Sequence, residues 1–201
     1  YAPQGGFLIG GVPFTAQEHP ALQSVAQVAL LCNDATLHDG PQGWSLTGDP
    51  TEGALVTLAL KAGLDATALH ASQPRIDAIP FESEHRFMAT LHHDHAGHAV
   101  ILVKGAPERV LDMCNAQRQW PADGAGTDAP LQHDYWRRAA NDCAARALRV
   151  LAIAIKRVPA QQHALQFADM EGGFTLLGLL GSMDPPRPEA VAAVAECQAA
   201  G

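Results

Sequence analysis

The sequence predicts an α/β fold of the α+β type, in which a mainly antiparallel sheet is flanked by helices. Two β-like runs, Phe87–His93 and His98–Val103, are separated only by Asp94–Gly97, and this spacing is typical of a hairpin with a glycine-containing turn. Strands and helices then follow one another without the regular alternation of a doubly wound parallel sheet. With 47% hydrophobic and 17% charged residues, the chain has enough apolar side chains to bury a core.

The first half of the chain contains a predicted helix and a predicted strand. Apolar residues recur at helical spacing behind Pro20, which predicts a helix over about residues 20–32. Trp44–Thr47 has the composition of a short strand.

A capping signal then starts a second helix, predicted from Pro50 to about Lys61. Asp49 has the position of the N-cap, Pro50 that of the first helical residue, and Glu52 the third position, where a carboxylate completes a capping box. Because glycine is favoured just after the last helical residue, this helix is expected to end at Gly63.

The second half contains two further helices and two strands. Helices are predicted for Pro107–Met113 and for the Ala- and Arg-rich segment Gln132–Leu148. Between them, Trp120–Pro130 is dense in turn-forming residues and is interpreted as a surface loop. The apolar runs Val150–Ile155 and Phe174–Leu180 are predicted to be strands.

The last segment differs from the rest in composition. Because each proline fixes its own φ and restricts the residue before it, a stiff hinge is expected at Asp184, Pro185, Pro186 and Arg187. An Ala-rich helix is predicted from Pro188 to about Ala200, with Val191, Val194 and Ala195 as the side chains it buries. We therefore expect one domain over residues 1–183 and, over 184–201, a hinge with the first helix of a truncated second domain. The residues at Tyr1 likewise favour a fragment or a processed chain.

Charge, hydropathy and cysteine content argue against several classes of protein. Thirteen Lys and Arg against 21 Asp and Glu give a net charge of −8, which argues against a nucleic-acid or anionic-membrane binder that acts through a basic field. The most apolar run, Phe174–Met183, is about half of the roughly 20 residues that a transmembrane helix needs, so no membrane insertion is expected. The four cysteines lie far apart without a C-x-x-C pair, which favours a reducing compartment over a disulfide scaffold or a zinc site.

Five short motifs follow one another along the chain: Gly48-Asp49-Pro50-Thr51-Glu52, Phe81-Glu82-Ser83-Glu84-His85-Arg86-Phe87-Met88, Val103-Lys104-Gly105-Ala106-Pro107-Glu108, Leu148-Arg149-Val150-Leu151-Ala152 and Met183-Asp184-Pro185-Pro186-Arg187. In this order they resemble the nucleotide-binding (N) domain of P-type cation-transporting ATPases, in the calcium-pump-like branch. The resemblance covers essentially the whole chain. The family's phosphorylation loop, Asp-Lys-Thr-Gly-Thr, does not occur, and no Asp is followed by Lys. The chain is therefore predicted to contain no catalytic residue and to bind ATP without hydrolysing it.

The resemblance implies a nucleotide-binding site of six residues: Glu52, Phe81, Arg86, Lys104, Gly105 and Arg149. By resemblance, Phe81 stacks on the adenine, which is worth about 1–3 kcal/mol. Lys104 lines the pocket beside Gly105, whose small size is expected to let a ligand approach the backbone. Arg86 and Arg149 contact the phosphates, although Arg86 stands where the family usually has Lys, which changes the geometry of that contact.

Each of these residues also has a purely structural interpretation. Phe81 alone suits a core position at a strand end, Lys104 a solvated strand end, and Arg149 a helix C-terminus. Glu52 is explained equally well by capping, so both of its interpretations stay open. Glu108 suits the first turn of a helix and is expected to be structural.

A histidine cluster suggests a different function. His92, His93, His95 and His98 surround Asp94 in the predicted hairpin turn, and imidazole is the commonest metal ligand. Neighbouring strand residues point to opposite faces, so His92 and His93 are not expected to converge on one ion. The alternative to nucleotide binding is a non-catalytic His-rich metal-binding or interaction module.

The resemblance implies that this domain holds ATP or ADP and presents the γ-phosphate to an aspartate on a neighbouring domain, with Mg²⁺ accompanying ATP in the full-length pump. The implied partners are the phosphorylation and actuator domains of the same chain. The parent protein would be an integral membrane cation pump, with this part at the cytosolic face of a bacterial inner membrane.

Overall fold

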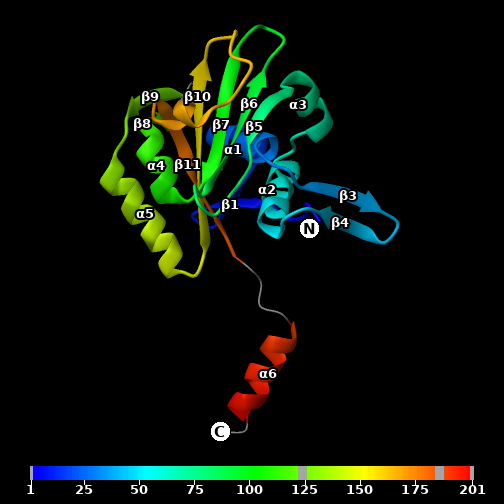
Figure 1. Ribbon diagram of the computed structural model, residues 1–201. Coiled ribbons are helices and arrows are strands. Elements are labelled where there is room, and N and C mark those ends of the chain that lie inside the picture. The colour runs from blue at the N-terminus through cyan, green and yellow to red at the C-terminus, as the bar shows by residue number, and fades with distance from the viewer. Residues whose placement is uncertain (1, 122–125, 184–187, 200–201) are drawn as a thin grey trace.

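A seven-stranded sheet with the order β5-β6-β7-β10-β11-β8-β9 forms the centre of the computed structural model (Figure 1), which describes residues 2–121, 126–183 and 188–199. Its strands are β5 Arg75–Ile79, β6 Phe87–His93, β7 Ala99–Gly105, β8 Cys114–Gln119, β9 Thr127–Pro130, β10 Arg149–Val158 and β11 Phe174–Ser182. Neighbouring strands are antiparallel except β8 and β11, which are parallel. The predicted mainly antiparallel sheet flanked by helices is confirmed.

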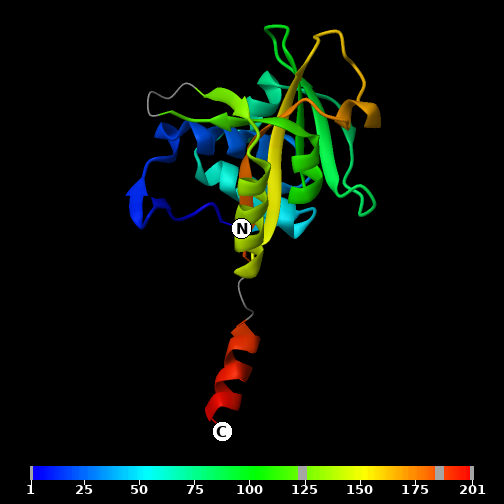
Figure 2. The same ribbon diagram turned by 90° about the vertical axis from the view of Figure 1, so that its left-hand side faces the viewer.

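Helices cover both faces of this sheet. Figures 1 and 2 show α1 and α2 on one side and α4 and α5 on the other. The helices are α1 Pro20–Leu31, α2 Pro50–Lys61, α3 Ala66–Ser72, α4 Pro107–Met113, α5 His133–Ala145 and α6 Pro188–Ala199, with short 3₁₀ turns η1 Ala16–Glu18 and η2 Phe167–Met170. Two small hairpins complete the described chain: β1 Phe7–Ile9 with β2 Val12–Phe14, and β3 Thr36–Gly40 with β4 Gly43–Thr47.

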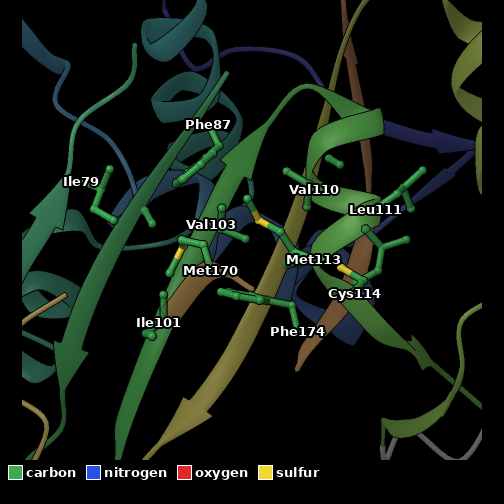
Figure 3. Close-up of a cluster of buried hydrophobic side chains, with 14 of the residues drawn as sticks. Ile79, Phe87, Ile101, Val103, Val110, Leu111, Met113, Cys114, Met170 and Phe174 are labelled. Carbon is green, nitrogen blue, oxygen red and sulfur yellow. The ribbon is translucent and has the colours of Figure 1, made fainter. Parts of the chain in front are cut away.

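The central strands β6 and β7 are buried on both faces, and their alternating side chains build two cores. One core holds Phe87 and Val103 against α4 and β11 (Figure 3). The other holds Met88 and Leu102 against α1. Lys104 follows Leu102 on the α1 face, so a charged side chain stands where this second core reaches the end of β7.

Helix ends explain where the sequence prediction succeeded and where it failed. The N-cap of α2 is confirmed, because Asp49 accepts hydrogen bonds from the backbone N–H groups of Thr51 and Glu52. Gly63 follows this helix with φ +83°, as predicted for a glycine C-cap. By contrast, α5 ends at Ala145 and not at Leu148, because Ala147 takes a left-handed φ of +58° and the Leu148 N–H returns to the Cys143 carbonyl oxygen.

Two predictions near the C-terminal half need correction. The interpretation of Trp120–Pro130 as a loop is wrong for its last part, because β9 pairs with β8 at the edge of the sheet, where the missing N–H of Pro130 is tolerated; residues 122–125 lie outside the described chain. Val194 and Ala195 of α6 are exposed and not buried, because no described element packs over them; the side chain of Val191 is outside the description. The predicted hinge, Asp184, Pro185, Pro186 and Arg187, also lies outside the described residues.

Among the described residues, no single helix is long and apolar enough to cross a membrane. Helices α2 and α3 are long and apolar enough only when taken together, and they are bent by 96° relative to each other.

Candidate functional site

A cavity of about 510 Å³ lies where the N-terminus of α2 meets the start of β6, the end of β7 and the start of β10. All six residues proposed from the sequence line it: Glu52, Phe81, Arg86, Lys104, Gly105 and Arg149. They come from four separate segments of the chain, which the neighbouring strands β6, β7 and β10 and the N-terminus of α2 bring together.

A buried ion pair forms one wall of the cavity. Lys104 Nζ lies 2.6 Å from Glu52 Oε1, and the two side chains are only 6% and 16% exposed. Glu52 Oε2 accepts a second hydrogen bond, from the backbone N–H of Asp34 at 3.3 Å. The interpretation of Lys104 as a solvated strand-end lysine is therefore wrong. The Glu52 carboxylate faces the cavity and its lysine, which favours the site interpretation over capping.

Each of the two arginines already contacts a polar partner within the domain. Arg86 Nη1 lies 2.6 Å from Glu108 Oε1, and both side chains are more than half exposed. Arg149 Nη1 donates to the hydroxyl of Thr51 at 2.8 Å. Arg149 is the first residue of β10, so its interpretation as a helix C-terminal cation is wrong. Glu108 stands in the first turn of α4, as predicted, but it also serves as the ion-pair partner of a cavity residue.

Phe81 supplies an exposed aromatic surface at the same cavity. Its side chain is 55% exposed, in contrast to Phe87 six residues later, which is fully buried. The interpretation of Phe81 as a core residue is therefore wrong. An open ring face beside three cations is a chemically suitable surface for a planar base that carries an anionic group.

The family model for the P-type ATPase, cytoplasmic domain N, matches residues 21–189. The chain belongs to this family. It is 39% identical over 212 residues to the Cation-transporting ATPase pma1 of Synechocystis, in an alignment that covers 100% of this chain and 22% of the relative. It is 39% identical over 189 residues to the Probable cation-transporting ATPase F of Mycobacterium tuberculosis (94% of this chain, 20% of the relative), and 31% identical over 209 residues to the Calcium-transporting ATPase of Bacillus subtilis (100% and 22%). The chain spans about a fifth of the length of these curated relatives. The resemblance stated from the five motifs is confirmed.

In this N domain Gly105 has a different role from the one expected. A Cβ at Gly105 would lie 2.5 Å from the carbonyl oxygen of Arg86 and 2.7 Å from Cβ of Phe87. The glycine is therefore required by the close approach of β7 to β6, where Gly105 pairs with Phe87. Its small size serves the packing of the strands, and the expectation that it serves the approach of a ligand finds no support in this contact.

The histidines of the N domain do not converge on one point. His92 is buried and bonded to the Gln73 carbonyl oxygen and the Thr90 hydroxyl, whereas His93 contacts the Gln162 carbonyl oxygen and His98 pairs with Asp94 at 2.8 Å. Within residues 2–121, 126–183 and 188–199, no three His, Cys, Asp or Glu side chains are placed to hold a metal ion. Burial also lowers the pKa of His92 to about 4. The metal-binding alternative thus lacks a set of ligands in this geometry.

Two polar residues that line the cavity, Thr51 and Asp34, were not expected at the site. Thr51 lies inside the first motif, but its hydroxyl accepts a hydrogen bond from Arg149, which lies 98 positions later in the chain. Asp34 lies after α1 in no recognised motif, and it reaches the cavity only because its loop folds over Glu52. No local sequence pattern signals either contact.

Proposed function

We propose that this N domain binds ATP and ADP in the cavity beside Phe81. The observation that carries the proposal is the convergence of one exposed aromatic ring and three cations on a single cavity of about 510 Å³. The ring suits the adenine, and the cations suit the phosphates. Ligand pockets of comparable size, roughly 300–1,000 Å³, are usual for small molecules.

The base and the phosphates are expected at different parts of the cavity. Adenine stacks on Phe81, while the phosphates approach the exposed guanidinium groups of Arg86 and Arg149. Lys104 keeps its ammonium on Glu52 and offers its apolar stem to the ligand.

Mg²⁺ is expected to enter as a companion of ATP and not as a resident ion. The three carboxylates that line the cavity are already engaged: Asp34 with Arg75, Asp49 with the N-terminus of α2, and Glu52 with Lys104. Among the described residues, no three His, Cys, Asp or Glu side chains are placed to hold a metal ion, and Mg²⁺ prefers several oxygen ligands. Nucleotide binding by the domain alone should therefore not require Mg²⁺.

In a full-length pump, the proposed role of this domain is to present the γ-phosphate to an aspartate on another domain of the same chain, at the cytosolic face of a bacterial inner membrane. The proposed partners are the phosphorylation and actuator domains, and residues 184–187 are proposed as the hinge. Because no Asp-Lys pair occurs in the sequence, the domain alone should release no phosphate from ATP.

Isothermal titration of the 201-residue chain with ATP, ADP, adenosine and GTP tests this proposal. We expect weak, saturable binding that prefers adenine and persists without Mg²⁺. Phe81→Ala should weaken adenosine and ATP by about fivefold to more than a hundredfold. Phe167→Ala is the matched control, because that ring is equally exposed, at 57%, but does not line the cavity. Absence of binding at millimolar ATP, or equal losses in the two variants, would contradict the proposal.

A further inference from the structure

Arg75, on the edge strand β5, does not line the cavity but holds the loop that closes it. Its guanidinium makes three contacts with the end of α1 and the loop that follows. Arg75 Nη1 lies 2.6 Å from Asp34 Oδ1, and Nη2 donates to the carbonyl oxygens of Leu31 at 3.1 Å and Asn33 at 2.5 Å. A guanidinium fixed by three acceptors is held more firmly than a lone surface ion pair.

The loop held by Arg75 in turn holds Glu52. Asn33 donates from its amide nitrogen to the backbone carbonyl oxygen of Glu52 at 3.0 Å, and the same nitrogen donates to Ala29 in α1. The backbone N–H of Asp34 donates to Glu52 Oε2 at 3.3 Å. Glu52 is thus fixed by this loop at its backbone and at its carboxylate, while its other carboxylate oxygen pairs with Lys104.

We propose that Arg75 is a positioning residue for the nucleotide cavity: it fixes the Asn33-Asp34 loop, and through that loop it fixes the Glu52–Lys104 pair. This inference rests on the proposed nucleotide binding. No other described cation contacts the Asp34 carboxylate or the Asn33 carbonyl oxygen. Loss of Arg75 should therefore release the loop whose backbone N–H, at Asp34, donates a hydrogen bond to Glu52.

The test compares Arg75→Met with Arg118→Met. Arg118 is a matched control, since it also forms an ion pair of 2.6 Å, with Asp128, but belongs to β8 and does not line the cavity. We expect Arg75→Met to lower ATP and adenosine affinity by about three- to tenfold, the value of roughly one hydrogen bond. Arg118→Met should bind both ligands as the wild type does. Circular dichroism and urea unfolding establish that each variant is folded.

Two site-specific NMR measurements distinguish a positioning role of Arg75 from a merely structural one. Arg75→Met should accelerate hydrogen exchange at the Asp34 amide and shift the carboxylate carbon resonance of Glu52, both measured by NMR without nucleotide, and Arg118→Met should change neither. If Arg75→Met does not fold, Arg75→Lys serves in its place, because one ammonium cannot reach all three acceptors, and the same losses are expected. A folded variant with wild-type affinity, or with unchanged Asp34 exchange, overturns the proposal. If the wild type binds no nucleotide, the proposed function fails, while the exchange and resonance measurements still decide whether Arg75 fixes the loop.

Discussion

The buried pair of Lys104 and Glu52 allows a quantitative test of how the cavity wall is built. Replacing Lys104 by Met keeps most of the apolar stem but leaves the Glu52 carboxylate, 16% exposed, without its cation. Breaking a buried pair by removing one partner typically costs about 3–5 kcal/mol. We expect the lower end, about 3 kcal/mol, because Glu52 keeps its hydrogen bond from the Asp34 N–H.

Urea unfolding of the nucleotide-free domain measures this loss. With a slope of about 2 kcal/mol per molar urea, the midpoint should fall by about 1.5 M. Arg86→Met is the matched control, because the Arg86–Glu108 pair has the same 2.6 Å separation but both side chains are more than half exposed, and it should cost less than about 1 kcal/mol.

The double variant Lys104→Met/Glu52→Leu decides whether the cost comes from an unpaired buried charge. With both charges removed, the free energy of unfolding should return to within about 1 kcal/mol of the wild type. A double variant as unstable as the sum of its two single variants would refute this reasoning, and so would a Lys104→Met variant that unfolds at the wild-type midpoint.

Three further outcomes are expected. Arg149→Ala should weaken ATP by about three- to tenfold at low salt and adenosine much less, and titration at high salt should shrink the difference; equal losses for the two ligands would contradict a phosphate contact. Burial lowers the folded-state pKa of His92 from 6.5 to about 4, so the unfolded chain binds the His92 proton more readily as the pH falls below 6.5. The free energy of unfolding should therefore fall by about 2–3 kcal/mol between pH 7 and pH 4.5. Urea unfolding should show a smaller loss over the same range in His92→Asn. Gly105→Ala should destabilise the domain by about 1–3 kcal/mol through its clash with β6, whereas Gly6→Ala, whose added Cβ would meet nothing within 4 Å, should unfold like the wild type.

The elements that the sequence predicted best carry their signals locally. The strand β6 and the helix α4 have the predicted bounds, and α2 has its predicted N-cap and glycine C-cap, because capping residues and apolar periodicity act within a few positions. The missed elements depend on distant partners. The strand β8 is polar, Cys114–Gln119, and is held by parallel pairing with β11, some 60 positions later. The hairpin of β1 and β2 is an exception, since Gly10-Gly11 between two apolar runs is a local hairpin signal that was overlooked.

The candidate site divides in the same way. All six of its residues lie in motifs whose order identified the family, so the residues themselves could be named from the sequence, and Arg86 was named although it departs from the usual Lys. The contacts that these residues make with one another and with their neighbours could not be predicted. The contacts of Lys104 with Glu52 and of Arg75 with Asp34 join positions 52 and 41 residues apart, and only the packing of α2 and of the loop after α1 against the sheet brings them within hydrogen-bond distance.

The acceptors that already face the cavity cations explain why nucleotide binding is expected to be weak. They also determine which cations the phosphates are expected to contact. The chain carries a net charge of −8, and each cavity cation already faces an acceptor: Glu52 for Lys104, Glu108 for Arg86 and Thr51 for Arg149. A phosphate must compete with these acceptors. Opening the exposed Arg86 pair costs at most about 1 kcal/mol, whereas opening the buried Lys104 pair leaves a carboxylate out of water at several times that cost. The phosphates are therefore expected to recruit the two arginines and to leave Lys104 on Glu52, so that stacking on Phe81 supplies the part of the affinity that salt does not change.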